Sequence, residues 1–201
     1  MMAAVSTSLA ESLVSEAQYL AMERASLTKH ELWHGELFAM TGGSLAHAML
    51  SMNIGAMLHS ALRDRPCRVL SADAKVHVPL SRGFVYPDVS VVCGAMQTYE
   101  GSNDVLSNPI LVVEVLSEST ERFDRGDKFA GYRSIPSLVD YVLISQANRI
   151  VEVYTRQVDA TWSLRVSDDE NPTIQLPSLG LQLSLRELYS GVRDEPASPP
   201  A

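Results

Sequence analysis

The sequence of 201 residues contains no hydrophobic run that approaches the roughly 18 apolar residues needed to cross a membrane as a helix. Its first residues also lack the basic start and the continuous apolar core of a secretory signal. We therefore expect a cytoplasmic protein that has no membrane partner.

Cysteine is scarce, with only two residues in the chain, Cys67 and Cys93. Two cysteines cannot form a disulfide framework, and neither belongs to a CxxC pair of the kind that binds a metal. We expect both to be buried free thiols in a reducing compartment.

An excess of positive charge is missing as well, because the formal net charge is −8. This balance argues against broad electrostatic attraction to nucleic acid, although a local basic surface at residues 63–68 or 122–133 remains possible. The apolar share of 46% and the charged share of 20% are those of an ordinary globular protein. We expect one domain over residues 1–192 and a disordered tail over residues 193–201.

The hydrophobic pattern predicts a mixed sheet flanked by helices, an α/β or α+β fold. Expected helices cover residues 8–26, 45–62 with Ser44 as N-cap, and 124–135. The second should have an apolar stripe at Leu45, Met49, Met52 and Ala56, and the third should have Asp124, Lys128 and Tyr132 on one face. Residues 30–40 should form two strands joined by a turn at Gly35. Further strands are expected at residues 68–80 and 84–93, which pair as a hairpin, and at residues 110–117, 138–145, 149–157 and 161–167. A closing segment of short strands and a helical turn is expected at residues 172–189.

Two acidic residues interrupt apolar strands. Glu114 lies at the centre of ILVVEVLS, the most apolar strand of its group and therefore expected to be central in the sheet. Asp88 follows Pro87 in VYPDVSVV. A buried carboxylate costs several kcal/mol unless it is paired, hydrogen-bonded or bound to a metal. If the two strands are neighbours, the carboxylates can converge, and Mg²⁺ is a suitable hard cation for such a pair. Lys128 on the following helix could bring a positive charge to the same place.

In this order and spacing the motifs are recognisable. PD, then EVL after a loop, then a helix with D-x-x-x-K-x-x-x-Y resembles the Uma-type family of restriction-endonuclease-like proteins, a branch of the PD-(D/E)XK nuclease superfamily. The resemblance extends from about Tyr19 to Val192 and includes ELWHGELFAM, the helix with His47, RPCRVLSADAKV and RIVEVY. It implies a restriction-endonuclease-like core with an N-terminal helix–hairpin–helix extension and additional C-terminal strands.

The resemblance also implies roles for particular residues. Asp88 and Glu114 match the acidic metal ligands, and the backbone carbonyl of Val115 would complete the protein's share of the metal shell. The superfamily pattern places lysine two residues after the glutamate, where this chain has Leu116, so Lys128 becomes the candidate lysine. Glu36 matches an acidic residue at the rim of such sites, giving Asp88, Glu114, Lys128 and Glu36 as candidate catalytic residues.

The implied activity is Mg²⁺-dependent hydrolysis of DNA phosphodiester bonds, with Mn²⁺ able to substitute for Mg²⁺. By analogy with the superfamily, the protein is expected to be a homodimer. An inactive nucleic-acid-binding or protein-binding module on the same fold remains an alternative. Purely structural roles for each acid also remain alternatives, as does an ordinary salt bridge between Lys128 and Asp124.

One further motif points to a different class of protein. HELWH, residues 30–34, satisfies the HExxH pattern of zinc peptidases, in which both histidines lie on one helix. Gly35 follows at once, and no glutamate occurs between Glu36 and Glu100 to supply a third ligand. The sequence therefore disfavours the zinc peptidase.

Overall fold

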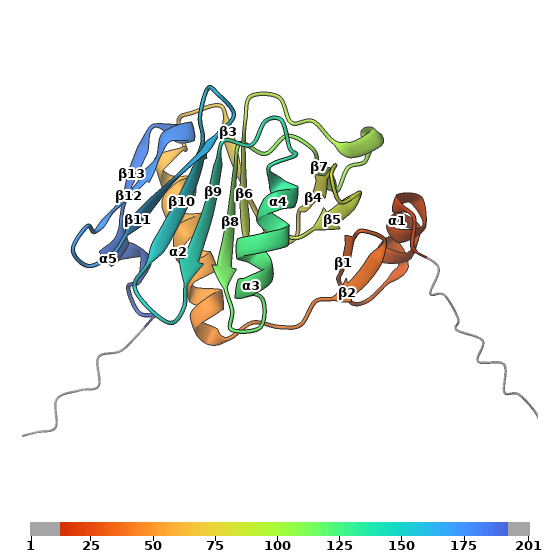
Figure 1. The fold of residues 1–201 in the computed structure, drawn as a ribbon, viewed down its shortest axis with the longest axis horizontal. Coiled ribbons are helices and arrows are strands. Elements are labelled where there is room, and N and C mark those ends of the chain that lie inside the picture. The colour runs from red at the N-terminus through yellow and green to blue at the C-terminus, as the bar shows by residue number, and fades with distance from the viewer. Residues whose placement is uncertain (1–12, 193–201) are drawn as a thin grey trace, which may run out of the picture.

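A six-stranded mixed sheet forms the centre of the computed structural model, which describes residues 13–192 (Figure 1). Its strand order is β11 (Trp162–Ser167), β10 (Val151–Arg156), β9 (Asp140–Ser145), β8 (Leu111–Leu116), β6 (Val89–Cys93) and β3 (Cys67–Ser71). β8 runs parallel to β9 and antiparallel to β6. Every residue of β8 is buried, which confirms the prediction that this most apolar strand is central.

A second sheet of five short strands lies beside the first. Its order is β2 (Glu36–Ala39), β1 (His30–Trp33), β5 (Gly83–Val85), β4 (Lys75–Val78) and β7 (Val105–Leu106). The predicted turn between β1 and β2 is confirmed, with Gly35 at a φ of 85° that few other residues adopt. α1 (Glu16–Ala25) packs on β1 through Tyr19, whose ring stacks on Phe84 of β5.

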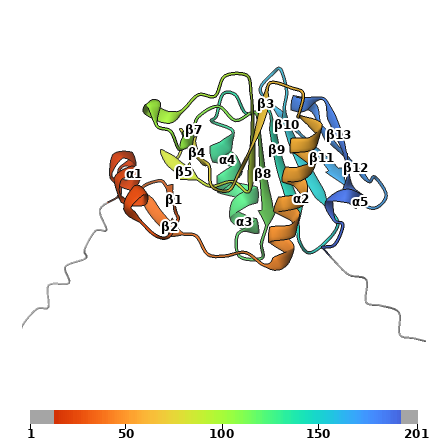
Figure 2. The same ribbon diagram turned by 180° about the vertical axis from the view of Figure 1, so that it is seen from behind.

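Helices cover both faces of the six-stranded sheet, as Figures 1 and 2 show from opposite sides. α2 (Leu45–Ala61) covers one face and buries its apolar side against Val113 and Val115 of β8. The opposite face carries a continuous helical segment made of α3 (Glu121–Phe123), the π-helical turn η2 (Asp124–Lys128) and α4 (Phe129–Tyr132). Tyr132 packs there with Val112 and Leu116 of β8.

The remaining elements are short. The 3₁₀ turns are η1 (Tyr99–Gly101) and η3 (Pro177–Leu179), and the C-terminal part contains β12 (Thr173–Leu176), β13 (Leu181–Ser184) and α5 (Leu185–Leu188). β12 and β13 pair with each other, as expected for the closing segment. Mixed sheets flanked by helices, with an N-terminal helix and C-terminal strands, confirm the predicted fold class.

The predicted hairpin of residues 68–80 and 84–93 exists, but each expected strand is two strands. β4 pairs with β5 in the five-stranded sheet, while β3 pairs with β6 in the six-stranded sheet. One arm is broken by the turn after Ser71, and the other between Val85 and Val89, where Pro87 cannot donate a ladder hydrogen bond. The hairpin thus bends from one sheet into the other, and Asp88 lies at the bend.

Two helix predictions need correction in detail. Within the described residues the first helix begins at Glu16, because the Ser15 side chain caps it there, and residues 8–12 lie outside the described part. In α2 the period and the Ser44 cap are confirmed, but the expected apolar stripe is largely exposed, with Leu45 at 84% and Met52 at 70%. The buried stripe comprises Leu50, Ile54, Leu58 and Leu62.

The prediction of buried free thiols is wrong, because Cys67 and Cys93 form a disulfide and are both only partly buried. The two residues pair directly across β3 and β6, with Cα atoms 4.0 Å apart. Such close cross-strand neighbours can be bridged even in a chain that has only two cysteines. The two cysteines are 26 residues apart in the chain, so no local sequence pattern indicated that they pair.

Removal of the disulfide by Cys67→Ser with Cys93→Ser should lower the free energy of unfolding by about 2–3 kcal/mol, because the unfolded chain regains loop entropy. Urea denaturation measures this, and parent protein treated with a reductant should match the double variant. Alkylation of two thiols in unreduced, freshly purified protein would contradict the pairing.

No helix within residues 13–192 is both long enough and apolar enough to span a membrane.

Candidate functional site

Glu114 is the buried acid of the central strand, with 5% of its surface exposed. Because side chains alternate along β8, Glu114 points to the same face as Val112 and Leu116, toward α4. There the Tyr132 hydroxyl donates a hydrogen bond of 2.6 Å to Glu114 Oε1, and Lys128 Nζ lies 3.0 Å from the same oxygen.

The π-helical turn η2 brings two charged residues to Glu114. Asp124 and Lys128 begin and end this turn, both are buried, and their charged atoms lie 3.7 Å apart. Tyr132 follows one turn later, so the predicted shared face of Asp124, Lys128 and Tyr132 is confirmed. Single π turns within α-helices often occur at functional sites.

Glu31, which the sequence indicated only as the glutamate of the disfavoured HELWH pattern, is the fourth member of the group. It comes from β1, its Oε1 lies 3.3 Å from Lys128 Nζ, and it also accepts a hydrogen bond of 2.9 Å from the Tyr86 backbone N–H. Gly131 allows this hairpin to approach α4, because a Cβ there would overlap the ring of Trp33. We call Glu31, Glu114, Asp124 and Lys128 the acid–lysine cluster.

Glu36, predicted at the rim from the same hairpin, lies on the edge strand β2 and is exposed. Each strand of the hairpin carries one acid in similar surroundings, Glu31 in HELW and Glu36 in ELFA, and the family resemblance indicated Glu36. The acid that contacts Lys128 in the structure is Glu31. Only the docking of β1 on α4 distinguishes them, and this tertiary contact leaves no local sequence signal.

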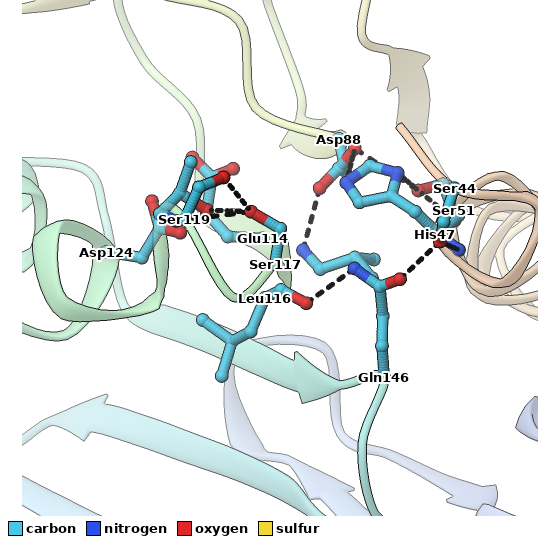
Figure 3. Close-up of polar contacts among 12 residues, drawn as sticks. Ser44, His47, Ser51, Asp88, Glu114, Leu116, Ser117, Ser119, Asp124 and Gln146 are labelled. Carbon is cyan, nitrogen blue, oxygen red and sulfur yellow. Dashed lines mark hydrogen bonds and ion pairs between the residues drawn. The ribbon is translucent and has the colours of Figure 1, made fainter. Parts of the chain in front are cut away.

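Asp88 directly precedes β6, at the end of that strand which lies beside the C-terminal half of β8. The last residue pair between β6 and β8 is Val89 with Val113. Beyond this pair, the Asp88 carboxylate accepts a 2.7 Å hydrogen bond from the Val115 N–H. Its other oxygen accepts a hydrogen bond from Ser51 Oγ at 3.2 Å and lies 3.4 Å from His47 Nε2. Figure 3 shows these contacts between Asp88 and α2.

Asp88 and Glu114 therefore lie near the same strand end but have partners on different sides. Asp88 contacts residues of α2, whereas Glu114 contacts residues of η2 and α4. They remain close enough that the Asp88 charge raises the pKa of Glu114. Within residues 13–192, no three His, Cys, Asp or Glu side chains already stand in a geometry that would hold a metal ion.

The electrostatics of the cluster are dominated by burial and by an excess of carboxylates. Burial raises the pKa of Glu114 to about 8, and the charges of Asp124, Asp88 and Glu31 add to the rise, while Lys128 opposes it. Burial also raises the pKa of Asp124. The three acids of the cluster outweigh the burial of Lys128 and raise the pKa of its amine, so Lys128 stays protonated.

We expect Glu114→Gln to stabilise the metal-free protein at neutral and alkaline pH. The pKa of Glu114 is raised on folding, so its contribution to stability is complete below its ordinary pKa and is lost as pH rises through about 8. Gln does not titrate and keeps an acceptor for Tyr132. The variant should match the parent near about pH 4 and exceed it by a few kcal/mol near pH 8, since one pKa unit corresponds to about 1.4 kcal/mol.

Urea denaturation across this pH range, in buffer treated with a chelator, measures the difference. The exposed Glu118 supplies the matched control, because Glu118→Gln should leave the pH profile unchanged. Parallel stability profiles for Glu114→Gln and the parent protein over the whole range would contradict the prediction.

The zinc-peptidase pattern at residues 30–34 does not form a metal site. His30 begins strand β1 and its ring pairs with Glu23 of α1 at 3.0 Å, while His34 is an exposed turn residue at a φ of 50°. The pattern requires both imidazoles on one helix, so the structure contradicts this alternative.

Comparisons with known proteins agree with the architecture. Residues 16–186 match the Uma2 family, whose description is "Putative restriction endonuclease". Two uncharacterised proteins of Synechocystis sp. are each 33% identical, one over 179 residues that cover 89% of this chain and 93% of the relative, the other over 163 residues that cover 81% and 92%. A crystal structure described as a putative nuclease belonging to DUF820, from Anabaena variabilis, superposes with a TM-score of 0.73 at 17% identity, covering 90% of this chain and 99% of the other.

Proposed function

Because the chain belongs to the Uma2 family of putative restriction endonucleases, we propose that it is a metal-dependent endonuclease that hydrolyses phosphodiester bonds in DNA. The observation that carries this proposal is the acid–lysine cluster beside Asp88, at the shared end of β6 and β8. The buried carboxyl groups of Glu114 and Asp124 and the partly buried one of Glu31 face one amine, and Asp88 adds a fourth acid nearby. This surplus of negative charge fits a divalent cation as the missing compensation.

The donor set supports the same cation chemistry. We propose that Asp88, Glu114 and the Val115 backbone carbonyl hold Mg²⁺, for which Mn²⁺ can substitute, because all three offer hard oxygen ligands. Such an ion, when bound, lowers the pKa of a water molecule and stabilises charge on the phosphate oxygens. Glu114 then has a role that explains why a carboxylate is kept in the core strand.

We propose that Lys128 acts on the phosphate or on the attacking water. Its amine is held by Glu114, Glu31 and Asp124, which keep it charged and restrict its position. A fixed, desolvated ammonium can stabilise negative charge that develops in the transition state. Glu31 and Asp124 are thereby positioning residues, and Tyr132 holds the carboxylate of Glu114 by a hydrogen bond to the same oxygen that Lys128 contacts.

DNA is the proposed partner, and a homodimer would suit cleavage of both strands of a duplex. With a net charge of −8, the chain should bind DNA weakly away from the site, so recognition must depend on the cation and on local contacts.

Supercoiled plasmid incubated with the full-length protein tests the proposal. We expect conversion to nicked and linear DNA in the presence of Mg²⁺ or Mn²⁺ and none with a chelator. Folded protein that leaves the plasmid intact under both ions, yet retards DNA in a gel, would overturn catalysis and identify a binding module.

A further inference from the structure

His47 approaches the proposed cation site from the side opposite to Lys128. It lies in the first turn of α2, and its ring Nε2 is 3.4 Å from Asp88 Oδ1 (Figure 3). The ring also lies beside the backbone of Val115, whose carbonyl belongs to the proposed donor set. The imidazole is mostly buried, with 23% of the side chain exposed, and Asp88 is 12% exposed.

The position of His47 is fixed by hydrogen bonds from three elements. Ser44 caps α2 by accepting the His47 backbone N–H at 3.1 Å, and its hydroxyl donates to Gln146 Oε1 at 2.5 Å. The Gln146 amide donates in turn to the Leu116 carbonyl at 2.6 Å, one residue beyond Val115 on β8 (Figure 3). The first turn of α2 is therefore tied to the strand that carries Glu114.

Ser51 orients the ring from the other side. Its Oγ lies 3.5 Å from His47 Nδ1, and its single hydroxyl proton is within hydrogen-bonding distance of two acceptors, the His47 carbonyl at 2.9 Å and Asp88 Oδ1 at 3.2 Å. A polar group on one ring nitrogen that leaves the other nitrogen facing the metal ligands is the usual arrangement for a histidine that binds a metal.

We propose that His47 Nε2 is a direct ligand of the cation bound by Asp88, and that this nitrogen makes the site prefer Mn²⁺ to Mg²⁺. The proposal rests on the proposed function and adds a ligand and a metal preference to it. Neighbouring ligands at about 2.0–2.2 Å from an octahedral ion are about 3 Å apart, so the pair at 3.4 Å needs only a small adjustment. Imidazole binds first-row transition ions, whereas Mg²⁺ prefers oxygen.

Pulsed electron paramagnetic resonance of the full-length protein loaded with Mn²⁺ tests this ligand directly. We expect hyperfine coupling to a ligand nitrogen that changes when histidine is labelled with the heavy nitrogen isotope, a result that needs no variant to fold. His47→Gln should abolish the coupling and weaken Mn²⁺ binding by at least about tenfold, while changing Mg²⁺ binding less. His59→Gln, an exposed histidine on the same helix, is the matched control and should retain both.

The outcomes separate the two proposals. Mn²⁺ bound without nitrogen coupling, but lost in Asp88→Asn, would overturn the role of His47 and leave the proposed nuclease site intact. Coupling that persists in His47→Gln would also overturn it, by assigning the nitrogen to another residue. Absence of any Mn²⁺ or Mg²⁺ binding to the parent protein would overturn the metal-dependent function itself.

Discussion

Asp88→Asn should abolish plasmid nicking, with a loss of roughly a hundredfold or more in rate. Asn keeps an oxygen that can accept the Val115 N–H, so the strand end should keep its geometry. What the substitution removes is the negative charge that the proposed cation needs, together with the charged partner of His47. The measurement is the initial rate of conversion of supercoiled plasmid at saturating Mn²⁺ or Mg²⁺.

Asp64 provides the control for this experiment, since it is an exposed aspartate after α2 and Asp64→Asn should leave the rate unchanged. Thermal unfolding of both variants shows whether the fold is retained. Parental nicking rates in folded Asp88→Asn would remove Asp88 from the metal site, and with it the proposed arrangement of the reaction.

Lys128→Met should lower the free energy of unfolding by about 3–5 kcal/mol, the largest stability effect expected in this protein. Methionine keeps most of the volume but removes the amine that pairs with the buried Glu114 and Asp124 and with the partly buried Glu31. Urea denaturation near neutral pH in the absence of metal measures the loss.

Two comparisons make this prediction specific. Lys29→Met removes a far more exposed ion pair, with Asp73, and should cost under about 1 kcal/mol. Addition of Glu114→Gln to Lys128→Met should recover part of the stability, because one buried charge is then removed. A cost for Lys128→Met no greater than that for Lys29→Met would show that the acid–lysine cluster is more hydrated than its burial indicates.

The fold was predictable where the pattern of apolar residues is local. The run of apolar residues around Glu114 indicated a central strand, and Gly35 indicated the turn of the first hairpin, both of which are confirmed. The bend that divides residues 68–80 between two sheets was not predictable, because Leu70, Ala72, Ala74 and Val76 alternate as if in one strand. The choice between one strand and two depends on which sheet each half pairs with.

The candidate site was predictable only in part. Lys128 was inferred from its place on the helix after Glu114 and from the family resemblance, and its amine lies within ion-pair distance of Glu114 in the structure. Glu31 and the contact of His47 with Asp88 join segments far apart in the chain, so no motif around either residue indicated them. The Cys67–Cys93 pairing was missed for the same reason, because a register between two strands decides it.

The bent hairpin means that the acid–lysine cluster is assembled across two sheets rather than on one. Glu31 belongs to the five-stranded sheet and Glu114 to the six-stranded sheet, and Lys128 contacts both. Glu31 and Glu114 can therefore hold the ammonium in one position only while the two sheets keep their relative orientation.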